Sequence, residues 1–91
     1  MYRLKFTPKA DEGLIRLKKS GDVQVLKKLS VLLKELAIHP TRGTGKPERL
    51  KHQSGDKWSR RISEKHRLVY EILEQIVTVE VIQVYGHYDD K

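Results

Sequence analysis

The stretch that decides the fold of this chain is residues 45–70, GKPERLKHQSGDKWSRRISEKHRLVY. It holds eight lysines and arginines against three carboxylates, and so contributes +5 of the chain's formal net charge of +7. Runs of like charge are often solvated or disordered, but apolar residues interrupt this one: Leu50, Trp58, Ile62, Leu68, Val69 and Tyr70. The stretch can therefore fold while it presents cations, which predicts a polyanionic partner.

The composition predicts one small domain spanning residues 1–91. A hydrophobic content of 37% and a charged content of 34% indicate a modest core under a heavily charged surface. The absence of cysteine excludes disulfides and thiolate sites. Residues 1–7 are too short for a signal peptide, and no apolar run approaches the length of about 20 residues that a membrane span needs. We therefore expect a cytoplasmic protein that does not enter a membrane.

The first half of the chain predicts one strand and two helices. Residues 2–7 alternate apolar and basic side chains, which is typical of a half-buried strand. Thr7-Pro8 then predicts an N-cap and the first helical position, and Ser20-Gly21 a helix end. Asp22 predicts the cap of a second helix, whose apolar residues recur every three or four positions until His39-Pro40. The following glycine-rich loop lacks the spacing of a nucleotide-binding loop.

The second half predicts strands over residues 48–52, 57–63, 66–73 and 76–85. Short turns separate these segments, so we expect antiparallel neighbours. The predicted fold class is α+β: one N-terminal strand, two helices and then an antiparallel sheet. Residues 86–91 are predicted to form a polar C-terminal tail that bears His87 and Tyr88.

Strand alternation predicts where three arginines point. Arg60 shares a face with Trp58, which predicts a structural role for it, whereas Arg61 and Arg67 emerge together on the opposite, open face. Two adjacent arginines repel each other unless an anion lies between them. The pair therefore predicts either a phosphate site or a surface network in which a carboxylate such as Glu48 neutralises it.

The four histidines are scattered without the spacing of a zinc site, so we expect no metal. His87 is either a surface residue near the end of the chain or a general acid–base group that titrates near neutrality. Gly86 precedes it and predicts a loosely held backbone at that point.

Four segments together resemble a known family: residues 45–52 (GKPERLKH), 58–62 (WSRRI), 66–70 (HRLVY) and 87–88 (HY). They are similar to the YoeB (Txe/YoeB) toxins of bacterial type II toxin–antitoxin modules, a branch of the RelE superfamily. The resemblance implies a microbial RNase-like α+β fold. It also implies an endoribonuclease that cuts messenger RNA codons in the ribosomal A site without a metal or any other cofactor.

The resemblance also implies roles for six residues. Glu48 falls on the position of the general base and His87 on that of the general acid. Lys51, Arg61 and Arg67 fall on the cations that stabilise the phosphate, and Tyr88 on the residue that orients the nucleotide. Such a site would promote attack of the RNA 2′-hydroxyl on its own phosphate, a group that DNA lacks.

The implied partners are the ribosome with its mRNA and an acidic, YefM-like antitoxin, with which the toxin, itself a monomer or dimer, would form an oligomer. Two alternatives remain open at this point. One is a basic module that blocks ribosomes without cutting, to which Glu48 would be of no use. The other is a ParE-like gyrase inhibitor on the same fold, which would need neither Glu48 nor His87.

Overall fold

The computed structural model describes residues 1–87, within which five strands form one sheet beside two helices. This confirms the predicted α+β class. In chain order the elements are β1 (Arg3–Phe6), α1 (Pro8–Ser20), α2 (Val23–Ile38), β2 (Glu48–Arg49), β3 (Lys57–Arg61), β4 (Arg67–Leu73), the 3₁₀ turn η1 (Glu74–Ile76) and β5 (Thr78–Gln83).

The helix ends lie where the sequence predicts them. The Thr7 hydroxyl accepts a hydrogen bond from the Ala10 N–H at the start of α1, and Gly21 ends that helix in the left-handed conformation at φ +70°. The Asp22 carboxylate accepts from the Val25 N–H at the start of α2. Side-chain caps of this kind satisfy amides that have no partner within the helix, which explains why these positions delimit the two helices.

The sheet has the order β1-β5-β4-β3-β2. The last four strands in sequence form an antiparallel meander, and β1 adds to its far edge parallel to β5. The beginning of the chain therefore pairs with the last strand. Because β2 lies at the other edge, β3 is the one strand with which it pairs in the described part of the chain.

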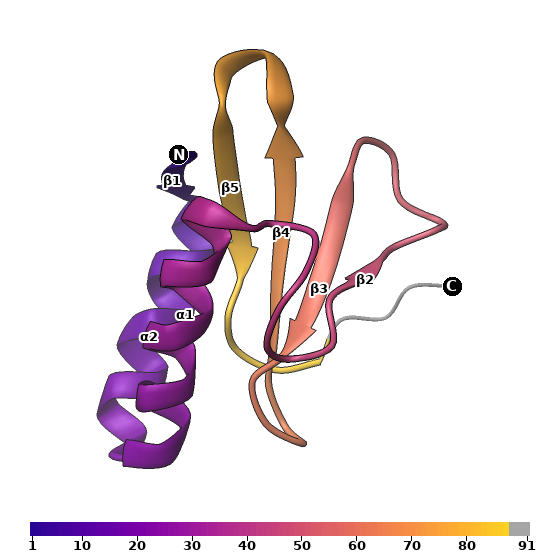
Figure 1. Cartoon of the computed structure of the whole chain (residues 1–91). Coiled ribbons are helices and arrows are strands. Elements are labelled where there is room, and N and C mark those ends of the chain that lie inside the picture. The colour runs from indigo at the N-terminus through magenta and orange to yellow at the C-terminus, as the bar shows by residue number, and fades with distance from the viewer. Residues whose placement is uncertain (88–91) are drawn as a thin grey trace.

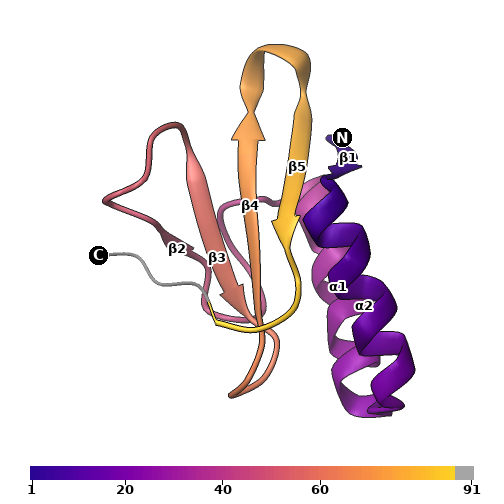
Figure 2. The same cartoon turned by 180° about the vertical axis from the view of Figure 1, so that it is seen from behind.

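Both helices lie on one side of the sheet, as the two opposite views show (Figure 1, Figure 2). Leucines of the helices, including Leu17, Leu32 and Leu36, are fully buried in one cluster with Leu68 and Tyr70 of β4 and with residues of β5. The other side of the sheet carries no helix formed by residues 1–87. No helix within residues 1–87 has the length and apolarity needed to cross a membrane.

All four strands of the second half are shorter than predicted, and β5 and β2 are so for local reasons. β5 begins only at Thr78, because Glu74–Ile76 form a 3₁₀ turn and Val77 follows in a left-handed conformation at φ +47°. β2 holds only Glu48 and Arg49. The next residue, Leu50, is buried and donates its N–H to the Lys57 carbonyl, after which the chain turns away.

Candidate functional site

Arg61 and Arg67 are direct cross-strand neighbours, which confirms the predicted adjacency. Arg61 ends β3, Arg67 begins β4, and the two lie on the face of the sheet opposite the helices. Arg61 is exposed and Arg67 half-buried. Neither guanidinium makes an ion pair with a carboxylate within residues 1–87. The predicted neutralisation by direct pairing with a carboxylate is therefore not seen in the described part of the chain, and the phosphate site stays a prediction.

Glu48 lies on the same face as these arginines. It pairs with Ser59, which is two residues from Arg61 along β3 and therefore points the same way. A diagonal neighbour of this kind is about 7–8 Å away, within reach of a long side chain. Glu48 is exposed and lines a surface hollow of ≈ 420 Å³ together with Arg49, Lys51 and His52. The hollow thus combines one carboxylate with the cation Lys51.

The two-residue strand β2 is held at both ends by backbone hydrogen bonds. The Arg61 N–H donates to the Gly45 carbonyl at 2.7 Å, and the Leu50 N–H donates to the Lys57 carbonyl at 2.8 Å. The side chain of Asp56 also connects β2 to β3, because its carboxylate accepts hydrogen bonds from both the Arg49 guanidinium and the Trp58 indole N–H. These hydrogen bonds fix the backbone that carries Glu48 relative to β3.

His87 is brought back toward the arginines by the chain that follows β5. That segment turns across the end of β4 toward β3 and β2 (Figure 1, Figure 2). The Arg67 N–H donates to the carbonyl of Gly86 at 3.0 Å, so His87 is attached directly beside the start of β4. His87 itself is exposed.

The prediction of a loose backbone at Gly86 is wrong. Besides the bond from Arg67, the Gly86 carbonyl accepts from the amide of Gln83, and the Gly86 N–H donates to Nδ1 of His66 at 2.9 Å. The glycine is needed because φ is +85° here, a conformation that side chains disfavour. Sequence reasoning missed both His66 and Gln83, since the contacts that reveal them depend on the path of the chain after β5.

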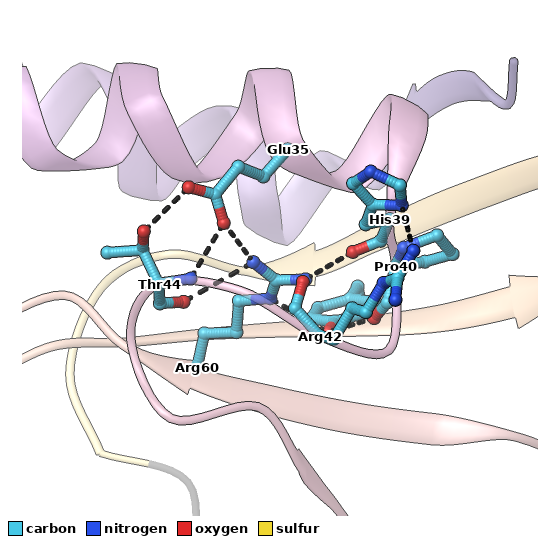
Figure 3. Close-up of polar contacts among 7 residues, drawn as sticks. Glu35, His39, Pro40, Arg42, Thr44 and Arg60 are labelled. Carbon is cyan, nitrogen blue, oxygen red and sulfur yellow. Dashed lines mark hydrogen bonds and ion pairs between the residues drawn. The ribbon is translucent and has the colours of Figure 1, made fainter.

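Arg60 has the structural role that its face predicted, as the centre of a buried network (Figure 3). Its side chain is fully buried and makes five hydrogen bonds, to Tyr70 Oη, Glu35 Oε1 and the carbonyls of His39, Arg42 and Thr44. Hydrogen bonds from Thr44, followed by that from Arg60, hold the pKa of Glu35 below its usual value despite partial burial. Burial raises the pKa of Tyr70. Arg60 thus fixes the loop that leads into β2.

Two predicted site residues remain, Lys51 and Tyr88. Lys51 lies in the turn after β2, beside Glu48. Tyr88 lies outside the described residues. Within residues 1–87, no three histidine, aspartate or glutamate side chains are grouped so that they could hold a metal ion.

The chain matches the YoeB-like toxins of bacterial type II toxin–antitoxin systems over residues 6–88. It is 36% identical over 86 residues to toxin YoeB of Streptomyces coelicolor, which covers 94% of this chain and 99% of that protein. It is 43% identical over 58 residues to toxin YoeB of Escherichia coli K12, or 64% of this chain and 69% of the relative.

Solved structures agree with this assignment. A YoeB/ParE toxin from Agrobacterium tumefaciens has a TM-score of 0.82 at 32% identity and covers 94% of this chain and 99% of its own. The YoeB–YefM heterotetramer from Staphylococcus aureus contains a chain with a TM-score of 0.76 at 31% identity, covering 97% of this chain and 99% of that one. These matches confirm the resemblance carried by the sequence motifs. The chain belongs to the YoeB toxin family of bacterial type II toxin–antitoxin systems.

Proposed function

We propose that this toxin is a ribosome-dependent endoribonuclease that cuts messenger RNA in the A-site codon and so stops translation. The observation that carries the proposal is the pair Arg61–Arg67, which has no carboxylate partner in residues 1–87 and lies diagonal to the exposed Glu48. A surface that only bound RNA would gain nothing from a carboxylate at that place. A surface that cut RNA would need a base there.

In the proposed reaction RNA supplies its own nucleophile, the 2′-hydroxyl. Glu48 accepts the proton of the 2′-hydroxyl, whose oxygen attacks the adjacent phosphorus. The bond from phosphorus to the 5′-oxygen breaks, His87 gives that oxygen a proton, and a cyclic phosphate and a 5′-hydroxyl result. Lys51, Arg61 and Arg67 stabilise the negative charge on the phosphoryl oxygens without having to reorganise during the reaction. We also assign to Tyr88 the orientation of the scissile nucleotide.

The proposed protein partner is an acidic antitoxin. The related toxin in the Staphylococcus aureus complexes is bound to YefM. An acidic segment would find complementary charge on the arginine face described above, and covering that face would exclude RNA. We propose that this chain forms a comparable toxin–antitoxin oligomer.

The test adds the purified toxin to ribosomes stalled on a defined message and maps the 5′ ends of the fragments. Wild-type protein is expected to cut within the A-site codon. Glu48→Gln and His87→Gln each remove one proton transfer, which is typically worth about 10²–10⁴-fold in rate. Both variants should still bind the ribosome, which a sedimentation assay measures in parallel.

Three outcomes separate the alternatives. Ribosome binding without cleavage, in the wild type and both variants alike, would leave a non-cutting ribosome blocker. Intact messages together with inhibited gyrase would favour the ParE-like activity. The same message with a 2′-deoxy nucleotide at the cut site is the chemical control, and it should resist cleavage completely.

A further inference from the structure

His66 occupies the turn between β3 and β4, next to Arg67, and contacts the segment that carries His87. Its Nδ1 atom accepts the Gly86 N–H at 2.9 Å. Its ring lies against Tyr85, with centroids 4.6 Å apart and planes inclined by 40°. Its own carbonyl accepts the N–H groups of Ile62 and Ser63, so the turn that holds the ring is itself fixed.

This hydrogen bond determines the protonation state of the ring. A backbone N–H can only donate, so Nδ1 must offer a lone pair, and the ring must be neutral with its proton on Nε2. If Nδ1 also carried a proton, both it and the Gly86 N–H would be donors, and no hydrogen bond could form between them. Protonation of His66 and the bond to Gly86 therefore exclude each other.

The same short segment is held from its other side by two groups. The Gly86 carbonyl accepts the Arg67 N–H at 3.0 Å, and the buried Gln83 amide donates to the carbonyls of both Gly86 and His87. Arg67 and Gln83 thus hold the carbonyls of Gly86 and His87, on either side of the His87 Cα, and His66 holds the Gly86 N–H, one peptide unit before them. Of the three, His66 alone changes its hydrogen-bonding capacity near neutral pH.

The groups around His66 favour its neutral form. Burial, followed by the positive charge of Lys65 and by His87, lowers the pKa of His66 below its ordinary 6.5, and Asp22 at the start of α2 opposes these effects. Arg16 of α1 lies over the Tyr85 ring, 4.8 Å from its centroid, and adds a further cation on that side. The bond to Gly86 is therefore formed at neutral pH and is lost as the pH falls through the folded-state pKa.

We propose that neutral His66 is a positioning residue for the reaction: it holds Gly86 so that His87 faces the phosphate site, and its protonation releases His87. The part that concerns the reaction rests on the proposed nuclease function, whereas the hydrogen bond itself does not. The toxin should therefore lose activity on acidification as His66 takes up its second proton.

Two substitutions separate the hydrogen bond from the shape of the ring. His66→Asn keeps an acceptor, since Oδ1 of asparagine is as many bonds from Cα as Nδ1 of histidine, but it does not titrate. His66→Phe keeps a ring against Tyr85 but has no acceptor. A merely structural role would make the phenylalanine variant the milder change, whereas the proposed role makes the asparagine variant the milder one.

The first measurement is NMR on the free, full-length toxin. In the wild type the Gly86 amide should exchange slowly, and its chemical shift should follow the titration of His66, whose ring nitrogens should show the Nε2–H tautomer. His66→Asn should keep the slow exchange without the titration, and His66→Phe should lose the protection. An unprotected Gly86 in the wild type, or an equally protected one in His66→Phe, would overturn the hydrogen bond and with it the proposal.

The second measurement is the rate of ribosome-dependent cleavage against pH. His66→Phe should lower kcat about 10-fold to 100-fold, the scale expected when a reacting group is misplaced by roughly 1 Å, with KM little changed. His66→Asn should stay near the wild-type rate at neutral pH and should lack the wild-type decline below pH 6.5. Unchanged kcat in His66→Phe would refute positioning even if NMR showed the bond. If the wild type cut no RNA at all, the proposed function would fail, and the NMR result would still decide whether His66 holds Gly86.

Discussion

At the scale of single residues, Arg60 should matter most for stability, because its fully buried guanidinium makes all its hydrogen bonds within the protein. Replacing Arg60 by methionine keeps the aliphatic stem but removes five hydrogen bonds, so that the three loop carbonyls lose this donor and Glu35 keeps only its hydrogen bonds from Thr44. We expect the free energy of unfolding to fall by about 3 kcal/mol, at the lower end for breaking a buried ion pair because Glu35 keeps some solvent contact. Urea denaturation followed by circular dichroism measures the change.

Arg49→Met is the matched control for this prediction. Arg49 also pairs with a carboxylate, Asp56 at 3.2 Å, but its side chain is 63% exposed. Exposed pairs of this kind contribute less than about 1 kcal/mol. Equal losses from the two substitutions would mean that the Arg60 network stabilises the protein no more than a surface ion pair does.

For single residues, the sequence predicted which face of a strand a side chain occupies but not which loop atoms it contacts. Strand alternation predicted correctly that Arg60 points inward and that Arg61 and Arg67 meet, since both statements depend only on a period of two and on a short turn. It did not predict the acceptors for Arg60, because four of the five belong to the end of α2 and the loop behind it. No periodic pattern specifies the path of such a loop.

At the scale of elements, the loop that leads into β2 requires Gly45 for two reasons that can be separated. Gly45 has φ +85°, and a Cβ there would lie 2.9 Å from the Arg61 carbonyl oxygen. Gly21, which ends α1, has a similar φ of +70° but nothing within 4 Å. Gly21→Ala should therefore cost only the strain of the left-handed backbone, about 1 kcal/mol. Gly45→Ala should cost roughly 1–3 kcal/mol more, because β2 must shift away from β3.

Thermal and urea unfolding of the two alanine variants, side by side, check this difference. If both substitutions lower the free energy of unfolding equally, the close approach of Gly45 to β3 contributes nothing and only its backbone conformation matters.

The element boundaries show where sequence patterns stop being informative. Capping residues delimit both helices, so these were predicted almost to the residue. Strand ends have no comparable signal, and the prediction extended β5 through Ile76 and Val77 although these apolar residues form an exposed turn. The anchoring of Gly86 was missed for a related reason. It requires β4 and the segment after β5 to meet, and that contact spans twenty residues of sequence.

At the scale of the whole molecule, the two-layer architecture divides the positive charge between two faces, for which we propose different roles. The helices carry lysines on one side, while the open face of the sheet carries Arg61 and Arg67, which have no ion pair within residues 1–87, beside Glu48. Net charge alone predicted a polyanionic partner but did not say which face would meet it. Strand register supports our proposal for that face, because it sets Arg61 against Arg67 in a cluster that the helical lysines do not join.

The separation of the arginine pair from the helical lysines predicts how the affinity for ribosomes depends on salt, which the net charge alone does not. Binding to ribosomes should weaken as salt rises from about 50 to 200 mM, since each phosphate neutralised by the protein releases counterions. In a Glu48→Gln background that prevents cleavage, Arg61→Gln and Arg67→Gln should each reduce the slope of log affinity against log salt by about one. Lys34→Gln removes the same charge from α2, on the helical layer, and should leave the slope unchanged. Equal reductions from all three would show that the toxin binds through its net charge alone, and the arginine pair would then have no special place in RNA recognition.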